Sequence, residues 1–278
     1  LRNLRDAVSS SEDIPHFQVF TQHTLYEMCD VLPLNKKQLK AMKRLWVHYS
    51  WNNHRRAELI LEGLSTIKSK PLLFRQEFKK SNYGIFGLID DSTLFYSLSP
   101  SSLVPFALYE FAEDKSGPPS RAYLKLWEVF TIHASELADK IKDKIVLDLG
   151  ACPGGWTYVL SQLGATVIAI DKAPLDDKVA QMPGVSYRQE SAFGIVPELF
   201  KPNEMPFALF SDVICYPERL YNLVEKWHQA GLKNMVCTLK FQGETDYASV
   251  EKFLQIENSK IIHQYHNKHE VTWVCWEE

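Results

Sequence analysis

The chain has 278 residues, of which 45% are hydrophobic, 12% aromatic and 23% charged, and its net charge is −3. This composition is typical of a globular protein with a sizeable core and excludes disordered, collagen-like and coiled-coil chains. No stretch approaches the roughly 20 apolar residues that a membrane helix requires, and the five cysteines form no C-x-x-C pair. We therefore expect a soluble cytoplasmic protein with reduced thiols, no metal site and no membrane partner.

Charge is distributed unevenly along the chain. Residues 1–80 carry 14 Lys and Arg against 8 Asp and Glu, or +6, which leaves 17 against 26, or −9, for residues 81–278. Residues 114–120 are rich in Gly, Pro and Ser, which interrupt periodic structure. We predict a basic amino-terminal α+β module over residues 1–115 and a second domain over residues 116–278.

The amino-terminal part combines helical and strand patterns. Residues 35–63 place apolar side chains at helical spacing, as at Leu39, Met42 and Trp46, and residues 83–98 are typical of a β-hairpin with its turn at 90–92. Basic residues and rings alternate here, so this face is a candidate RNA-binding surface. The alternative is that Trp46 is a core residue and that the basic residues are a solvated face. The basic residues are Lys36, Lys37, Lys40, Lys43, Arg44, Arg55 and Arg56, and the rings are Trp46, His48, Tyr49, Trp51 and His54.

From residue 120 onward, short apolar strands alternate with helices. This order predicts a parallel sheet covered by helices on both faces, which is a Rossmann-like α/β fold. Because the last two strands follow one another without a helix, we expect an antiparallel pair at one edge of the sheet. The predicted strands are 144–149, 166–170, 185–188, 207–210, 234–239, 260–264 and 271–276, and the predicted helices are 122–130, 155–163, 217–230 and 247–256.

The first of these strands runs into a glycine-rich turn, Asp148-Leu-Gly-Ala-Cys-Pro-Gly-Gly-Trp156. Glycines let a ligand approach the backbone, and a helix start offers unpaired N–H groups. Asp171 lies 23 residues after Asp148, at the end of the next strand, where a carboxylate can accept hydrogen bonds from ribose hydroxyls. Asp148 suits a cation better than a pyrophosphate. The pattern favours S-adenosylmethionine as cofactor; the alternative is that the glycines only build a tight connection and Asp171 caps a helix.

The segment from Asp148 to Trp156 resembles the cofactor-binding signature of the FtsJ/RrmJ family of ribose 2′-O-methyltransferases. It is most similar to the subgroup that methylates a cytidine of large-subunit ribosomal RNA. Four further segments resemble family motifs in the same order, namely PSRAYLKL at 119–126, SD at 211–212, LKFQG at 239–243 and HEV at 269–271. The resemblance covers residues 116–278 and implies an S-adenosylmethionine-dependent methyltransferase fold that acts on RNA, ribosomal RNA above all.

The resemblance also implies a catalytic tetrad of Lys125, Asp212, Lys240 and Glu270. A ribose 2′-hydroxyl is a poor nucleophile until its proton is removed, and a lysine can remove it only when a second cation or burial lowers the pKa of that lysine. We expect Lys240 to be the base and Lys125 to supply the second charge and align the 2′-oxygen. The two carboxylates would orient the ammonium groups. Taken singly, each of the four residues has an alternative as a solvated, capping or strand-ending side chain.

A set of cofactor-binding residues follows from the same resemblance. It comprises Asp148, Gly150, Ala151, Pro153, Gly154, Gly155, Trp156, Asp171, Ser191 and Asp212. Ser191 stands where the family commonly offers an Asp to the adenine. After Asp212 the family's Met-Ala-Pro is replaced by Val213-Ile-Cys-Tyr-Pro217, which affects the fit of the target nucleotide more than the chemistry. Two alternatives remain, a cap or transfer-RNA 2′-O-methyltransferase and a catalytically silent RNA-binding or assembly factor that keeps the fold.

Overall fold

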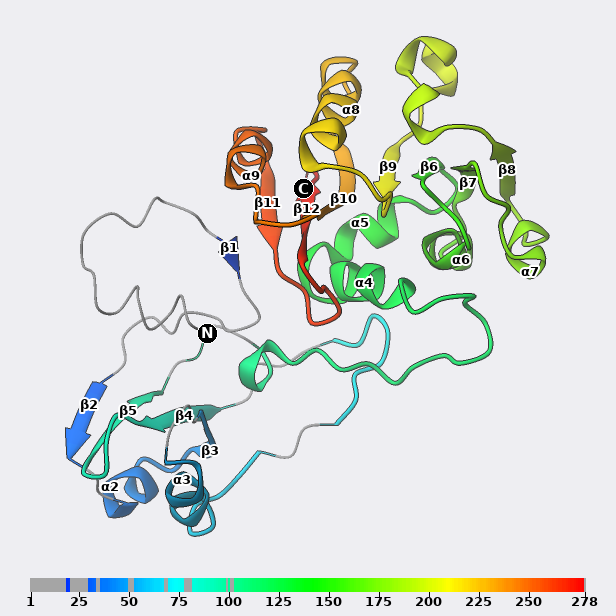
Figure 1. Cartoon of the computed structure of the whole chain (residues 1–278). Helices are drawn as coiled ribbons and strands as arrows, with labels where there is room; N and C mark the ends of the chain where they lie inside the picture. The colour runs from blue at the N-terminus through cyan, green and yellow to red at the C-terminus, as the bar shows by residue number, and fades with distance from the viewer. Residues whose placement is uncertain are drawn as a thin grey trace.

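The computed structural model describes residues 19–20, 30–33, 36–49, 53–67, 70–77, 82–98, 100 and 103–277. These residues form an eight-stranded sheet, mostly from the second half of the chain, and a four-stranded sheet from the first half (Figure 1). Among the described residues, no helix is long and apolar enough to cross a membrane.

The large sheet is parallel except for one strand. Its order is β1-β11-β12-β10-β9-β6-β7-β8, and β12 runs antiparallel to both of its neighbours, β10 and β11. The predicted strands and the antiparallel pair are confirmed. The pair is followed at the edge by β1, which pairs in parallel with β11. The strands are β1 (Val19–Phe20), β6 (Ile145–Leu149), β7 (Thr166–Asp171), β8 (Val185–Gln189), β9 (Ala208–Ser211), β10 (Asn234–Lys240), β11 (Ser259–Ile262) and β12 (Glu270–Cys275).

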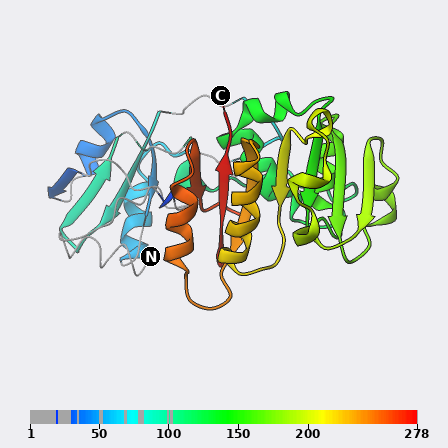
Figure 2. The ribbon, with the colours of Figure 1, turned by 90° about the horizontal axis from the view of Figure 1, so that it is seen from above.

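Helices cover both faces of this sheet, as the view in Figure 2 shows. Val146 belongs to the core beneath α4, α5 and α6, whereas its neighbour Leu147 belongs to the core beneath α8 and α9. This alternation along one strand is what a sheet buried on both faces requires. The predicted Rossmann-like fold is therefore confirmed, and α5 and α7 are helices that the sequence did not predict. The helices are α4 (Tyr123–Glu128), continued by a π-helical turn at Val129–His133, α5 (Ser135–Lys140), α6 (Gly155–Gln162), α7 (Asp177–Ala180), α8 (Pro217–Gln229) and α9 (Tyr247–Leu254).

The small sheet has the order β2-β5-β4-β3. The predicted hairpin is confirmed, since β4 and β5 are antiparallel and Asp90 Oδ1 accepts hydrogen bonds from the backbone N–H groups of Ser92 and Thr93 at 2.7 and 2.8 Å. The elements are β2 (Asp30–Pro33), α2 (Lys36–Ala41), β3 (Leu45–His48), α3 (His54–Leu61), β4 (Tyr83–Leu88) and β5 (Thr93–Ser97).

Helical structure throughout residues 35–63 is a wrong prediction, because residues 45–48 form β3. Lys43 takes a φ of 51° shortly after α2, and Asn53 takes a φ of 49° before α3. Between them β3 pairs in parallel with β4. Trp and Val pack well in a paired strand, so this pairing outweighs the helical spacing of the apolar residues. Trp46 is 1% exposed and its Nε1 donates to the Leu39 carbonyl. Trp46 is therefore a core residue and offers no stacking surface, while Trp51 lies outside the described residues.

Residues on the amino-terminal side of the predicted boundary at 116 pack into the core of the large domain. Leu72, Tyr109 and Phe111 belong to the same buried cluster as α4. The ring of Phe74 stacks on that of Trp127, with centroids 4.8 Å apart and planes 10° apart. A chain cut near residue 116 would expose part of this core, and the division into two domains stays a prediction.

Candidate active site

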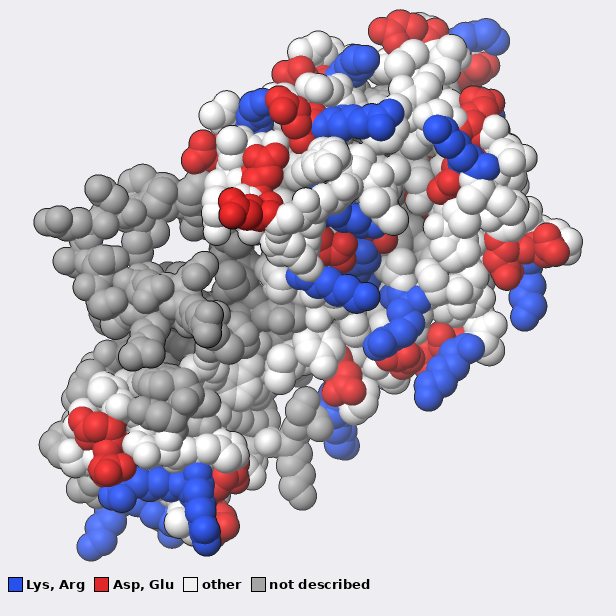
Figure 3. Space-filling model, in the orientation of Figure 1, with Lys and Arg blue, Asp and Glu red and all other residues white. Residues whose placement is uncertain are grey.

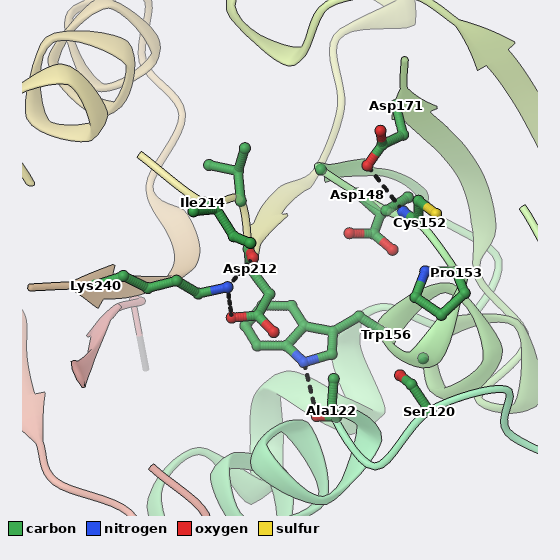
Figure 4. Close-up of a pocket in the computed structure, with 14 residues that line it drawn as sticks. Ser120, Ala122, Asp148, Cys152, Pro153, Trp156, Asp171, Asp212, Ile214 and Lys240 are labelled. Atoms are coloured by element: carbon green, nitrogen blue, oxygen red, sulfur yellow. Dashed lines mark hydrogen bonds and ion pairs between the residues drawn. The ribbon is translucent and has the colours of Figure 1, made fainter. Parts of the chain in front are cut away.

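A cavity of about 330 Å³ lies at the carboxyl ends of β6, β7, β9 and β10 (Figure 4). Ligands of α/β proteins bind at this edge because the loops that follow parallel strands diverge there, and the volume suits a small molecule. The residues that line it are Ser120, Ala122, Asp148, Gly150, Ala151, Cys152, Pro153, Gly155, Trp156, Asp171, Asp212, Val213, Ile214 and Lys240.

The glycine-rich turn owes its shape to two glycines with positive φ. Gly150 has a φ of 82°, and an added Cβ there would lie 2.6 Å from Val213 Cβ. Gly154 has a φ of 116°, and its added Cβ would lie 2.9 Å from Val179 Cγ1 in α7. Both positions therefore require glycine for backbone and packing reasons. Gly154 is not part of the lining, and its contact with the cofactor stays a prediction.

Asp148 is a buried carboxylate at the floor of the cavity, with 1% of its surface exposed. Its Oδ2 accepts a hydrogen bond of 2.6 Å from Thr157 Oγ1, and its Oδ1 has no partner among the described residues. Burial raises the pKa of Asp148 to about 7, against the lowering effect of the Thr157 hydrogen bond, and the charge of Asp212 raises it further. A positively charged ligand group would satisfy both the charge and the free oxygen.

Asp171 is held by the turn itself. Its Oδ2 accepts from the Cys152 backbone N–H at 3.0 Å, and its Oδ1 accepts from the Ala173 backbone N–H at 2.9 Å. The following helix, α7, is capped by Asp176 instead, whose side chain accepts from the Lys178 backbone N–H. Asp171 is therefore not a helix cap, and its carboxylate is oriented at the rim of the cavity.

The four residues of the expected tetrad form one network. Lys125 Nζ lies 2.7 Å from Asp212 Oδ1 and 3.2 Å from Glu270 Oε1. Lys240 Nζ lies 3.0 Å from the same Asp212 oxygen and also donates to the Asp212 carbonyl. Lys240 lines the cavity, whereas Lys125, with 8% of its side chain exposed, lies behind Asp212 and outside the lining. The structure thus gives the two lysines unequal access to a ligand.

Three neighbouring strands bring three of the four residues of this network together. Lys240 is the last residue of β10, and the antiparallel register of β12 pairs it directly with Glu270. Asp212 follows β9, which is the parallel neighbour of β10 on the other side. The carboxyl ends of these strands therefore converge, as parallel strands require, and the antiparallel β12 contributes its first residue at the same edge.

The helix that carries Lys125 is fastened to the β11–β12 connection. Gln264, which is fully buried, donates through Nε2 to the Lys125 carbonyl at 2.6 Å and accepts from Thr272 Oγ1 at 2.6 Å. Glu128, also buried, accepts from the Tyr265 backbone N–H at 3.0 Å, and burial raises the pKa of Glu128 well above its ordinary value. These links set the backbone of Lys125 relative to the strand that begins at Glu270.

Several cavity residues were not singled out from the sequence. Ser120, Ala122, Cys152, Val213 and Ile214 line the cavity, and all five lie within or beside segments that resemble family motifs. The Ser120 hydroxyl is buried without a partner among the described residues. In contrast, Ser191 is not part of the lining; it precedes a short 3₁₀ turn at Ala192–Gly194, and its contact with adenine stays a prediction.

The small sheet carries a second group of polar side chains. His48, His54 and Glu58 each place a ligand-type atom within 4.8 Å of the others. Glu58 Oε1 lies 2.6 Å from His48 Nε2, so the pair already joins β3 to α3. We assign no ion to this group.

The raised pKa of Asp148 predicts how the stability of the fold depends on pH. A carboxyl group with a higher pKa in the folded than in the unfolded chain binds a proton on folding. Its contribution to the free energy of unfolding is therefore present at low pH and is lost as pH rises. For Asp148 this window runs from its ordinary value of 3.8 to about 7. The difference in unfolding free energy between the wild type and Asp148→Asn, measured by urea denaturation, should decrease across that window and then stay constant. A constant difference from pH 4 to pH 8 would contradict the assignment.

Comparison with known proteins identifies the domain that contains this cavity. The family model for FtsJ-like methyltransferases matches residues 118–215, and a second model, the HRDC domain, matches residues 1–46. The chain is 31% identical over 197 residues to ribosomal RNA large subunit methyltransferase M of Shewanella sp. strain W3-18-1, which covers 65% of this chain and 54% of that protein. The protein of the same name from Shewanella denitrificans is also 31% identical, over 65% of this chain and 52% of that protein. The chain thus spans about half the length of the curated relatives that it matches.

Solved structures show a more distant likeness. A putative ribosomal RNA methyltransferase from Plasmodium falciparum is 18% identical, with 57% of this chain and 97% of that chain covered and a TM-score of 0.42. The family match covers every residue of the cavity lining except Lys240. By this match residues 118–215 form an FtsJ-like methyltransferase domain, which contributes the glycine turn and the ends of β6, β7 and β9 to the cavity.

Proposed function

We propose that this chain transfers a methyl group from S-adenosylmethionine to a ribose 2′-hydroxyl of ribosomal RNA, as a cytoplasmic enzyme. The observation that carries the proposal is the pair of ammonium groups, Lys125 and Lys240, that share one oxygen of Asp212 beside an acidic cavity. The relatives named for methylation of large-subunit ribosomal RNA support the choice of substrate.

The cavity fits S-adenosylmethionine, the methyl donor of this class of domain. The donor, when bound, supplies a methyl group on a positively charged sulfur. Asp148, Asp171 and Asp212 line the cavity and complement a cation, and two of the buried polar atoms there, Asp148 Oδ1 and Ser120 Oγ, lack partners among the described residues. Asp148 would hold the ammonium end, and Asp171 would accept hydrogen bonds from the ribose hydroxyls.

Lys240 is the residue that would take the proton from the 2′-hydroxyl. It alone of the two lysines lines the cavity, and 18% of its side chain is exposed, so a ribose can reach it and a proton can leave to solvent. To accept that proton Lys240 must be a neutral amine, and it lies beside a second cation, Lys125, on the same Asp212 oxygen. Lys125 would act through this shared oxygen and not by touching the 2′-oxygen, which differs from the role expected from the resemblance.

Asp171→Ala tests the cofactor site. We expect the Kd for S-adenosylmethionine, measured by calorimetry, to rise more than about tenfold, because a charge-assisted pair of hydrogen bonds is lost. Asp177→Ala removes an exposed carboxylate from α7 and serves as the matched control. Equal affinities in the two variants would place the ribose of the cofactor elsewhere.

Lys240→Ala tests the proposed base. Methyl transfer to ribosomal RNA in a single turnover should be lost, while the Kd for S-adenosylmethionine stays nearly unchanged, because the task of Lys240 arises at the nucleophile. Lys125→Ala should also be impaired, and the double variant should be no worse than the more impaired single variant. Lys226→Ala, an exposed lysine on α8, is the control. A Lys240→Ala enzyme that keeps most of its rate would contradict the role as base.

The amino-terminal part would supply most of the RNA affinity. Figure 3 shows Lys and Arg gathered around α2 and α3, and Lys36, Lys37, Lys40, Lys43, Arg55 and Arg56 are exposed there. The domain that contains the cavity carries more Asp and Glu than Lys and Arg and is therefore a poor binder of a polyanion by itself. Contacts between this basic face and RNA phosphates would give affinity without sequence information.

A salt titration of RNA binding tests that assignment in the full chain. Replacing Lys37, Lys40, Arg55 and Arg56 by Gln should reduce the slope of log Kd against log salt by about 3, since each phosphate contact contributes roughly 0.7 with single-stranded RNA. The control replaces four exposed lysines of the methyltransferase domain, Lys142, Lys178, Lys201 and Lys226, and so removes the same charge. An equal change of slope in the control would show that only net charge matters.

A further inference from the structure

The connection from β9 to α8 is anchored to the rest of the domain through Val213 and Cys215. Val213 packs so closely on the glycine turn that an added Cβ at Gly150 would overlap it, and Cys215, 6% exposed, is part of the core beneath α8. Pro217, which is buried, then begins α8. The segment is thus fixed in position by its inward side chains and by the proline that follows.

The two outward residues of this segment are apolar and exposed. Ile214 is 77% exposed, the largest value among the exposed large apolar side chains of the described residues, and Tyr216 is 64% exposed. The two exposed residues flank the buried Cys215, where the chain bends before α8. Neighbouring apolar side chains that are exposed to water on an anchored segment are typical of a binding surface.

Ile214 borders the proposed site of methyl transfer, and Tyr216 lies two residues further along the chain. Ile214 lines the cavity together with Asp212 and Lys240, and Figure 4 shows its side chain beside them at the cavity. A ribose whose 2′-hydroxyl meets Lys240 carries its base on the adjacent ring carbon. The base must therefore lie on whatever surface adjoins Lys240, and the apolar surface there is that of Ile214.

Positive charge flanks the same segment. Arg219 lies three residues after Tyr216, at the start of α8, and its guanidinium is 3.8 Å above the centre of the Phe193 ring. Cys215 lies between the two exposed residues, and burial raises the pKa of its thiol to about 11. The positive charges of Arg219 and Lys240 oppose this shift, so both cations lie near Cys215. A ligand that combines a flat ring with an anionic group complements this arrangement.

We propose that Ile214 and Tyr216 form a platform for the base of the target nucleotide, whose ribose faces Lys240 and whose neighbouring phosphate faces Arg219. This inference rests on the proposed function and adds that the target nucleotide is unpaired. In a duplex the neighbouring bases cover both faces of each base, whereas a splayed base can stack on a protein side chain.

Enzyme kinetics test the platform. The substrate is large-subunit ribosomal RNA purified from cells that lack the enzyme. Tyr216→Ala should raise the KM for RNA by about tenfold, the effect of losing one stacked base, and Ile214→Ala should raise it less. The Kd of Tyr216→Ala for S-adenosylmethionine should equal that of the wild type, because Tyr216 lies outside the cavity lining. Tyr216→Phe keeps the ring and should behave as the wild type. Leu199→Ala removes an apolar side chain that is 62% exposed and lies outside the cavity lining, and is the matched control.

A binding experiment gives a readout that is independent of catalysis. The wild type should bind a short labelled single-stranded RNA more tightly than its duplex, and Tyr216→Ala should lose that preference. An unchanged KM and an unchanged preference in both Ala variants would overturn the platform. Self-association of the chain that Tyr216→Ala abolishes, with the KM unchanged, would assign the surface to a second copy and overturn it too. If the wild type methylates no RNA, the proposed function fails by itself, and the single-strand preference still reports on the platform.

Discussion

One carboxylate oxygen, Asp212 Oδ1, serves two ammonium groups at 2.7 and 3.0 Å. Two cations at such distances repel each other, and partial burial deprives them of solvent screening, so the pair is stable only while the anion stays between them. Glu270 supplies a second negative charge, to Lys125 alone. This asymmetry leaves Lys240 with the shared oxygen and a carbonyl, at the side of the network that faces the cavity. The proposed chemistry depends on this arrangement.

The fold has to deliver these groups from four separate elements. The insertion of β12 between β10 and β11 places Glu270 opposite Lys240 by backbone register. Gln264 and Glu128 then fasten α4 to the connection before β12, so that the Lys125 backbone cannot shift without breaking buried hydrogen bonds. Such bonds are costly to lose because the separated groups would remain buried. The antiparallel strand is thus part of the site and more than an edge of the sheet.

The cavity and the network differ in what they leave unsatisfied. The ammonium groups of the network are paired within the protein, whereas the cavity keeps a buried oxygen of Asp148 and the Ser120 hydroxyl without partners among the described residues. The raised pKa of Asp148 records the cost of holding that carboxylate out of water. A cationic ligand would remove this cost, which makes the cavity a better place for a methyl donor than for a phosphate-bearing cofactor.

The sequence by itself determined the strands of residues 116–278 and the helices α4, α6, α8 and α9, because continuous apolar strands, a glycine turn and their order are local properties that any buried parallel sheet imposes. It also indicated Lys125, Asp212, Lys240 and Glu270 through motif resemblance, and the structure brings them together. Only the tertiary structure decided that residues 45–48 form a strand, that Lys125 lies behind Asp212 and that Ile214 borders the cavity. Each of these outcomes depends on a partner distant in sequence, and spacing along one chain carries no information about which distant strand or side chain will pair.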